Sequence, residues 1–397
     1  MNKITYLDNN ATTPLHPEVK KSFIDALDIF GNASSLHQMG RIARAHIEDA
    51  RAKVADFLDA SPEEIIFTSG ASESNNAILN NVVCDNSSCG TKVCSSTCCS
   101  HVITSVIEHP SVYETCKELA KDGVKVTFVG VDNKGVIKMD QIKEALKTRA
   151  ALVSIMLANN EIGSIQPIKE VVAIAKATGT LVHTDAVQAI GKMKVSVKDL
   201  GVDYLSLSGH KLYGPKGIGV LYVKKGIKFC PLIKGGHHEF NLRAGTENIP
   251  AIVALGKAVE VLKTGQEAEV AQIKKLRDSL KDGIVRSIPD IIINGDVENG
   301  LVNTLNISFK YVEGEAIMLY LDLEGIEVST GSACASGSLE PSQVLLSTGI
   351  PIEFAHGSIR FSFGRENTQA DVDKVLEVLP PIIAQLRKMS PLYKKQK

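Results

Sequence analysis

A lysine placed directly after an expected strand has the clearest chemical potential in this chain. Residues 204–208 (YLSLS) have the alternation typical of a strand, and Gly209, His210 and Lys211 follow at once. Small neighbours allow a lysine to be partly desolvated, which lowers its pKa, and only an unprotonated amine forms a Schiff base. Lys211 is therefore a candidate covalent catalyst.

Asp185 ends another expected strand, and Gln188 follows it within one turn. An aspartate at this place is also a common helix N-cap, and taken alone it favours that structural interpretation. Together, Lys211 and Asp185 meet two needs of a pyridoxal phosphate site, which are a lysine for covalent attachment and a carboxylate for the pyridinium nitrogen. The third need is a cradle for the phosphate.

The segment Ser69–Ser72 (SGAS) is the candidate cradle, because it follows an expected strand and opens a helix. Free backbone N–H groups and the helix dipole favour an anion there. Glycine and serine are also ordinary helix caps, so this segment alone does not decide the matter. His109 and Asn160 follow expected strands in the same way, although a strand-end histidine is more often structural.

Cys334 lies within residues 329–338 (STGSACASGS), where every other residue is small. A lone cysteine is most often a buried structural thiol. A segment with almost no bulky side chain, by contrast, has nothing to pin it into a core and suits an exposed loop that presents a nucleophile. Both interpretations stay open on these residues alone.

A cysteine-rich insert, about residues 85–100, interrupts the chain with serine, threonine and few large apolar residues, which indicates a surface loop. The cysteine spacing matches no standard zinc pattern. We expect a solvated loop without a catalytic role, and metal binding or redox sensitivity is the alternative. Five of the eight cysteines lie in or beside it, at Cys84, Cys89, Cys94, Cys98 and Cys99.

The elements that must position these residues alternate between short β-branched runs and helix-length segments. This alternation predicts an α/β domain with a mainly parallel sheet, in which ligands bind at the carboxyl ends of the strands. Strands are expected at residues 63–68, 102–106, 124–129, 151–157, 180–184, 204–208 and 219–223.

The pattern changes after about residue 248, where a long helical stretch over 249–288 leads into an α+β arrangement. We therefore predict a large domain over residues 16–260, with the insert, and a smaller α+β domain made of residues 1–15 and 261–397, which carries Cys334. In the smaller domain, strands are expected at 304–309, 327–330 and 358–363, and helices at 313–323 and 369–388.

Composition narrows the class of protein. The 397 residues carry 44 basic and 45 acidic side chains, so there is no basic footprint for nucleic acid. The most apolar stretch, residues 150–158, is far shorter than the roughly 20 residues that cross a bilayer, and the chain does not begin like a secretory signal. We expect a cytoplasmic protein that binds neither nucleic acid nor a membrane.

A series of motifs resembles the cysteine desulfurases, the NifS/IscS-like group of fold-type I (aminotransferase class V) pyridoxal phosphate enzymes. The resemblance covers almost the whole chain and implies a large domain with a seven-stranded sheet and a small α+β domain. The motifs are YLDNNATTP at 6–14, FGN at 30–32 with His37, NNE at 159–161, SGHK at 208–211, RAGT at 243–246, SACAS at 332–336 and SIRFSFGR at 358–365.

The resemblance implies a role for each candidate residue. Lys211 looks like the Schiff-base lysine of pyridoxal 5'-phosphate, His109 like the residue stacked on the ring, and Asp185 like the partner of the ring nitrogen. Arg360 and Asn32 look like substrate ligands, with Arg360 holding the carboxylate. Further cofactor contacts are implied for Asn160 and Gln188 around the phenolic oxygen, and for Ala71, Ser72, Ser208, His210 and, from the other subunit of a homodimer, Thr246 at the phosphate.

By the same resemblance, the reaction converts L-cysteine to L-alanine and leaves the sulfur as a persulfide on Cys334. The sulfur would pass to a NifU/IscU-like scaffold protein for iron–sulfur cluster assembly, and Cys334 would be only a transient iron–sulfur ligand. The alternatives are a selenocysteine lyase or another fold-type I enzyme, and, in a different class, a thiol-rich metal carrier that uses the insert. A transaminase is disfavoured because it needs no thiol.

Overall fold

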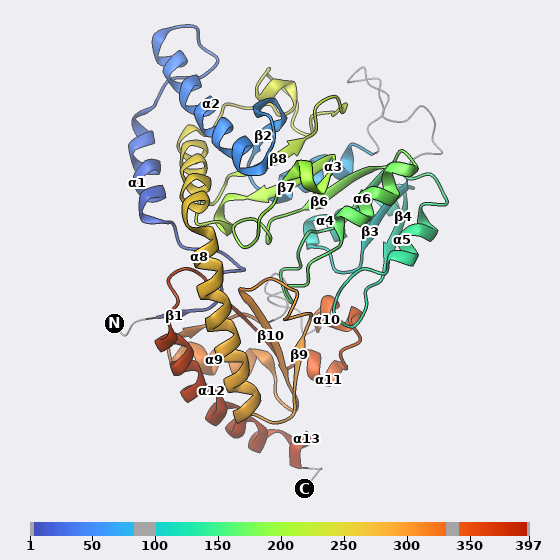
Figure 1. The fold of residues 1–397 in the computed structure, drawn as a ribbon, viewed down its shortest axis with the longest axis vertical. Coiled ribbons are helices and arrows are strands. Elements are labelled where there is room, and N and C mark those ends of the chain that lie inside the picture. Colours follow the sequence, from blue (N-terminus) through green and yellow to red (C-terminus); the bar gives the residue numbers. More distant parts are fainter. Residues whose placement is uncertain (1–3, 83–100, 331–340, 395–397) are drawn as a thin grey trace.

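The computed structural model describes residues 4–82, 101–330 and 341–394, so the insert and Cys334 lie outside the described residues. The described chain forms a large α/β part and a smaller α+β part, and one long helix runs through both (Figure 1). The fold class expected from the sequence is confirmed. Within the described ranges, no helix has the length and apolarity needed to cross a membrane.

A seven-stranded sheet forms the centre of the large part. Its order is β2-β8-β7-β6-β5-β3-β4, and all neighbouring pairs are parallel except the two made by β8. The strands are almost entirely buried apart from edge strand β4, as expected for a sheet covered on both faces. Their bounds are β2 Ile65–Thr68, β3 His101–Ser105, β4 Lys125–Val129, β5 Leu152–Ser154, β6 Leu181–Asp185, β7 Tyr204–Ser208 and β8 Gly219–Val223.

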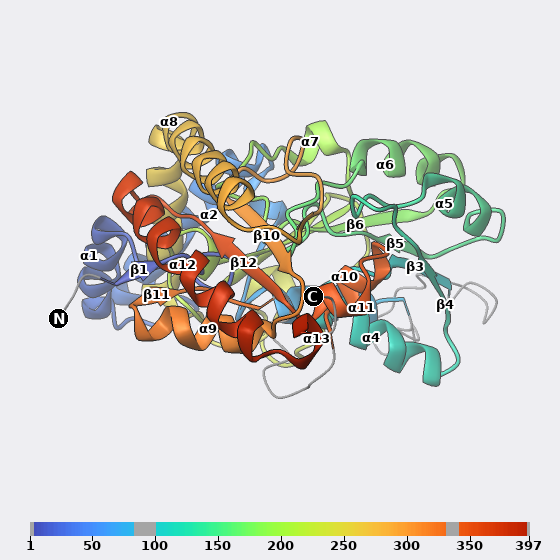
Figure 2. The same cartoon turned by 90° about the horizontal axis from the view of Figure 1, so that it is seen from below.

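Helices cover both faces of this sheet (Figure 2). On one face, α3 (Ala71–Asn80) and α4 (Pro110–Lys121) bury residues such as Ile78 and Val112 against the strands. The other face holds the larger core, to which α2, α5, α6 and the first half of α8 contribute. The bounds are α1 Pro17–Asp25, α2 Gln38–Leu58, α5 Met139–Ala145, α6 Ile168–Ala177, α7 Val197–Leu200 and α8 Ile249–Ser287, with 3-10 turns η1 Ala26–Asp28, η2 Pro62–Glu64, η4 Gly209–Lys211 and η5 Glu239–Asn241.

The smaller part is built on an antiparallel sheet of order β12-β10-β9, backed by a separate apolar core. The first described strand, β1 (Thr5–Tyr6), pairs with β11 (Ile326–Glu327), so the N-terminal segment packs into this part. The remaining elements are β9 Ile291–Asn294, β10 Thr304–Phe309, α9 Gly314–Leu323, α10 Gln343–Ser347, α11 Ile352–Ala355, β12 Ser358–Ser362, α12 Gln369–Met389 and α13 Pro391–Lys394.

Helix α8 links the two cores. Its apolar residues up to Leu262 belong to the core of the large sheet, and those from Ile273 onward belong to the core of the smaller part. The boundary expected at residues 260 and 261 therefore falls inside one continuous helix, just before this change of packing partner. We propose the division into residues 16–260 and residues 1–15 with 261–397 on this basis, with α8 as the shared element.

Candidate active site

A cavity of about 530 Å³ opens at the carboxyl ends of the large sheet. Strands β2, β3, β5, β6 and β7 run in the same direction, so the residues that follow them converge at one edge. The residues expected in the site that line this cavity are Ala71, Ser72, His109, Asn160, Asp185, Gln188, Ser208, His210, Lys211 and Arg360.

Lys211 ends the η4 turn directly after β7. Its Nζ donates hydrogen bonds to the main-chain oxygens of Asn10 and Ala11, the latter at 2.8 Å. The turn before it is tightly packed, because a Cβ on Gly209 would lie 2.8 Å from Ile218 Cγ2. Glycine is required at this close approach, which fixes the point from which the lysine enters the cavity.

Asp185 ends β6 and is only 5% exposed. Its Oδ2 accepts a hydrogen bond from Asn75 Nδ2 at 2.8 Å, and its Oδ1 accepts one from the backbone N–H of Val187 at 3.0 Å. Both donors are neutral, so they orient the carboxylate without neutralising it. A charged acceptor in this position suits a protonated ring nitrogen.

His109 caps helix α4, and its Nδ1 accepts a hydrogen bond from the backbone N–H of Ser111 at 3.1 Å. Burial lowers the pKa of His109; the carboxylate of Asp185 opposes this shift, and the charge of Lys211 adds to it. The ring is therefore neutral near pH 7. Because a backbone N–H can only donate, the single ring proton belongs on Nε2.

The N-terminus of α3 provides a place for a phosphate. Its N-cap, Gly70, makes no side-chain capping bond, and a Cβ built on Gly70 would point into open space. Ser72 and Ser208 add hydroxyl groups, and burial lowers the pKa of His210 to about 4, so this histidine is a neutral partner. An open helix N-terminus with hydroxyl groups fits a phosphate, and the amine and carboxylate beside it fit the rest of pyridoxal phosphate.

Arg360 enters the cavity from β12 in the smaller part and is 2% exposed. Its Nη2 pairs with Asp8 Oδ1 at 2.8 Å, and its Nη1 donates to the main-chain oxygen of Asn160 at 3.0 Å. Its Nε is buried and has no hydrogen-bond partner among the described residues. An unused guanidinium N–H in such a place fits a carboxylate ligand.

Three residues expected in the site do not line this cavity. Asn32 and Thr246 are both exposed, and the Oδ1 of Asn32 accepts a hydrogen bond from the backbone of Ser34. Cys334 lies outside the described residues. Within the described ranges, no group of three or more His, Cys, Asp or Glu side chains forms a metal-binding cluster.

Two further residues, Asn75 and Asn10, hold residues of the site although no role was expected for them. Asn75 lies on α3 one turn after Ala71 and donates a hydrogen bond to Asp185. Its helical spacing from the phosphate cradle is the only feature of the sequence that points to this residue. Asn10 is 1% exposed, and its main-chain oxygen accepts hydrogen bonds from Lys211 Nζ and from Gln188 Nε2. Asn10 belongs to the motif at residues 6–14, but local spacing in the sequence does not predict that it contacts residues 188 and 211.

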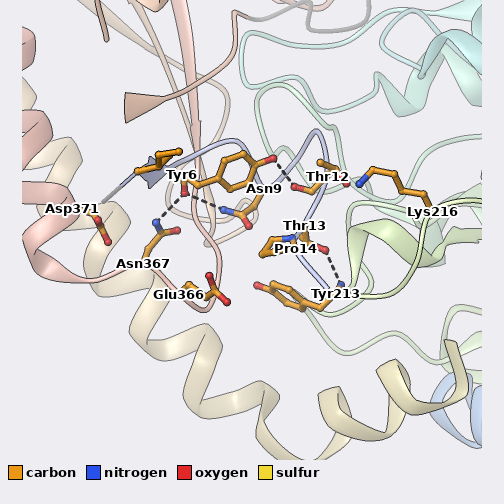
Figure 3. Close-up of a pocket in the computed structure, with 11 residues that line it drawn as sticks. Tyr6, Asn9, Thr12, Thr13, Pro14, Tyr213, Lys216, Glu366, Asn367 and Asp371 are labelled. Atoms are coloured by element: carbon orange, nitrogen blue, oxygen red, sulfur yellow. Dashed lines mark hydrogen bonds between the residues drawn. The ribbon is translucent and has the colours of Figure 1, made fainter. Parts of the chain in front are cut away.

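A second cavity, of about 370 Å³, lies beside the N-terminal segment (Figure 3). Thr12 and Lys216 line both of these cavities, whereas Tyr6 and Tyr213 line the second but not the first. The Tyr6 hydroxyl donates to the main-chain oxygen of Thr12 at 2.9 Å. None of the residues expected in the site lines this second cavity.

Comparison with known proteins places this architecture in a family. The family model for aminotransferase class-V matches residues 5–375. A cysteine desulfurase IscS of Dictyoglomus turgidum is 48% identical over 100% of this chain and 98% of its own length, and one of Methanosarcina thermophila is 47% identical over 100% and 96%.

Solved structures agree with these relatives. A NifS-like protein superposes with a TM-score of 0.89 at 39% identity, covering 97% of this chain and all of its own. The structure described as SspA in complex with cysteine gives a TM-score of 0.78 at 34% identity, covering 92% and 100%. The chain belongs to the aminotransferase class-V family and, within it, to the cysteine desulfurases.

Proposed function

We propose that this protein is a pyridoxal phosphate-dependent cysteine desulfurase that converts L-cysteine to L-alanine and passes the sulfur to Cys334. The observation that carries the proposal is the convergence of Lys211, Asp185 and His109 in one cavity beside the open N-terminus of α3. The family membership selects desulfuration among the reactions that such a site supports.

Bound pyridoxal phosphate supplies an electron sink for the carbon skeleton of the substrate. Lys211 would hold the cofactor covalently and would move the Cα proton of the substrate. Asp185, oriented by Asn75, would pair with the ring nitrogen. Ser72, Ser208, His210 and the backbone of α3 would bind the phosphate.

Arg360 binds the substrate carboxylate through its unused Nε–H, and Asn160 lies beside it. The thiolate of Cys334 attacks the substrate sulfur, the sulfur–Cβ bond breaks, and its electron pair stays with the three-carbon fragment. One proton added to Cβ and one returned to Cα by Lys211 then complete alanine. His109, neutral with its proton on Nε2, is the group that exchanges a proton near the substrate sulfur.

We further propose that the protein acts as a homodimer. Asn32 and Thr246 are exposed in the single chain, and two large apolar side chains close to Asn32 in sequence, Phe30 and Leu36, are 79% and 90% exposed. Side chains of this kind are expected to be covered by a partner. Light scattering should give twice the mass of the chain, and a monomer that turns over cysteine would contradict the proposal.

The persulfide sulfur is proposed to pass to a NifU/IscU-like scaffold for iron–sulfur cluster assembly, with Cys334 as only a transient iron–sulfur ligand. A cytoplasmic location stays a prediction from the sequence. Mixing persulfide-loaded protein with a purified scaffold tests the transfer, since labelled sulfur should appear on the scaffold.

The variant Cys334→Ser tests the desulfurase proposal directly. It should bind pyridoxal phosphate and cysteine but lose alanine production by orders of magnitude, because a hydroxyl has a far higher pKa than the roughly 8.5 of a thiol and forms no persulfide. The matched control is Cys116→Ala, since Cys116 is buried and its pKa is raised to about 12 by burial. Wild-type rates of alanine and persulfide formation in Cys334→Ser would overturn the mechanism.

A further inference from the structure

A second lysine, Lys192, lies close to the proposed cofactor site but does not line its cavity. Its Nζ donates hydrogen bonds to Gln188 Oε1 at 2.5 Å and to Asn10 Oδ1 at 3.0 Å. Both acceptors are neutral side-chain amides, and among the described residues Lys192 forms no ion pair. A partly buried lysine without a carboxylate partner is costly, so its place calls for an explanation.

The two acceptors are themselves held by partners of fixed polarity. Gln188 Nε2 donates to the main-chain oxygen of Asn10 at 3.0 Å, which can only accept. Asn10 Nδ2 donates to the main-chain oxygen of Asn160 at 3.1 Å. An ammonium group can only donate, so Lys192 and these carbonyl groups together define which end of each amide is oxygen and which is nitrogen.

This polarity matters for Gln188, which lines the cavity. Its Oε1 accepts a hydrogen bond from Lys192, which does not line this cavity, and its Nε2 has a second N–H beyond the one given to Asn10. An N–H stabilises a negatively charged oxygen on a ligand, whereas an amide oxygen in the same place repels it. Without Lys192, nothing else among the described residues holds the Gln188 oxygen.

We propose that Lys192 is a positioning residue that fixes the side-chain amide of Gln188 with its N–H toward the phenolic oxygen of the cofactor ring. The proposal rests on pyridoxal phosphate as the cofactor. It also gives Lys192 a second contact, to the side chain of Asn10, whose main-chain oxygen accepts from Lys211 Nζ.

The electrostatic surroundings agree with this geometry. Burial lowers the pKa of Lys192 well below its usual value, and the charges of Lys211 and Arg360 lower it further. Lys192, Lys211 and Arg360 thus lie close enough for their charges to influence one another. A neutral Lys192 still has N–H groups to donate to the Gln188 oxygen. It could also accept, but the bond from Gln188 Nε2 to the main-chain oxygen of Asn10 keeps the amide oxygen toward Lys192 in that state.

The test is the pH midpoint at which the visible absorption of lysine-bound pyridoxal phosphate changes, measured without substrate. An N–H donated to the phenolic oxygen disfavours protonation of the neighbouring nitrogen, so Lys192→Met should raise the midpoint by about one pH unit. Lys192→Gln should give an intermediate shift, because its amide presents oxygen or nitrogen to Gln188. The matched control is Lys194→Met, an exposed neighbour, which should keep the wild-type midpoint.

A double-mutant cycle separates positioning from a direct charge effect. If Lys192 acts through Gln188, adding Lys192→Met to Gln188→Ala should leave the midpoint of Gln188→Ala unchanged. Additive shifts, or a wild-type midpoint in both Lys192→Met and Lys192→Gln, would overturn the proposal. Should Lys192→Met not fold, Lys192→Gln alone and combined with Gln188→Ala makes the same comparison. A wild-type protein that binds no pyridoxal phosphate would instead overturn the proposed function.

Discussion

The floor of the cavity and the seam that closes it are built in different ways. The floor consists of His109, Asp185 and Lys211, each of which ends its own strand of the large sheet or follows it by a few residues. The seam consists of Asn10, Glu161 and Arg360, which come from the N-terminal segment, the large part and the smaller part. Asn10 Nδ2 and Arg360 Nη1 both donate to the main-chain oxygen of Asn160, 150 and 200 residues away in sequence.

The difference shows what a local pattern can and cannot place. Parallel strands deliver their carboxyl ends to one edge whatever lies between them, so a floor residue needs only a strand and a short step after it. A seam residue reaches its place only when two segments that are distant in sequence pack against each other in one specific arrangement. The floor should therefore carry the covalent chemistry, and the seam should govern binding and the pH dependence of stability.

The largest effect is expected in the floor, from Lys211→Ala. Without the amine, pyridoxal phosphate has no covalent attachment and the Cα proton has no base, so cysteine turnover should fall below detection. Borohydride treatment followed by mass spectrometry should find no cofactor on the protein. The control Lys228→Ala changes an exposed lysine and should be indistinguishable from wild type. Cofactor still fixed to the protein in Lys211→Ala would mean that another lysine holds it.

The fold was largely predictable because its periodicity is strong. All seven strands of the large sheet were expected within a few residues of their bounds, although β5 ends at Ser154, earlier than expected. The strands β1 and β9 were missed. β1 has only two residues, and β9 is a half-buried edge strand, so neither shows the apolar alternation on which the prediction depends.

The site was predictable only in part, because the prediction depends on local patterns in the sequence. Local spacing pointed to Lys211 and Asp185, whereas Arg360 and Gln188 received roles only through the family resemblance. Asn75 and Lys192 received none, since each acts through a neighbour: Asn75 holds Asp185, and Lys192 holds Gln188. A residue that orients another leaves no signature of its own in spacing or composition.

A smaller effect is expected in the seam, from Arg360→Lys. The lysine keeps the charge but loses the planar pair of N–H groups, so the KM for cysteine should rise by roughly tenfold, about 1.4 kcal/mol, while kcat changes less. Cofactor absorbance should persist. The control Arg365→Lys alters an arginine that pairs with Glu269 outside the cavity and should leave KM unchanged. A large loss of cofactor with an unchanged KM would show that Arg360 holds the cofactor and not the substrate.

The smallest effect concerns the third seam residue, Glu161, which accepts a hydrogen bond from the Ser342 hydroxyl. Burial raises its pKa to about 7 from 4.5, and the Ser342 bond and the charge of Arg360 oppose the shift. Between these values the folded protein binds more protons at Glu161 than the unfolded chain does. The stabilising contribution is therefore complete below pH 4.5 and is lost as the pH rises through 7.

Glu161→Gln should remove this dependence, because the amide resembles the protonated acid at every pH. The unfolding midpoint of the variant, compared with that of wild type, should rise as the pH goes from 5 to 8, by an amount that corresponds to at most ~3 kcal/mol. The control Glu170→Gln, on an exposed face of α6, should follow the wild-type curve. Parallel curves for wild type and Glu161→Gln would show that the Glu161 carboxyl is ionised at neutral pH. The seam would then hold the Glu161 carboxylate near the positive charge of Arg360, which favours its ionised form.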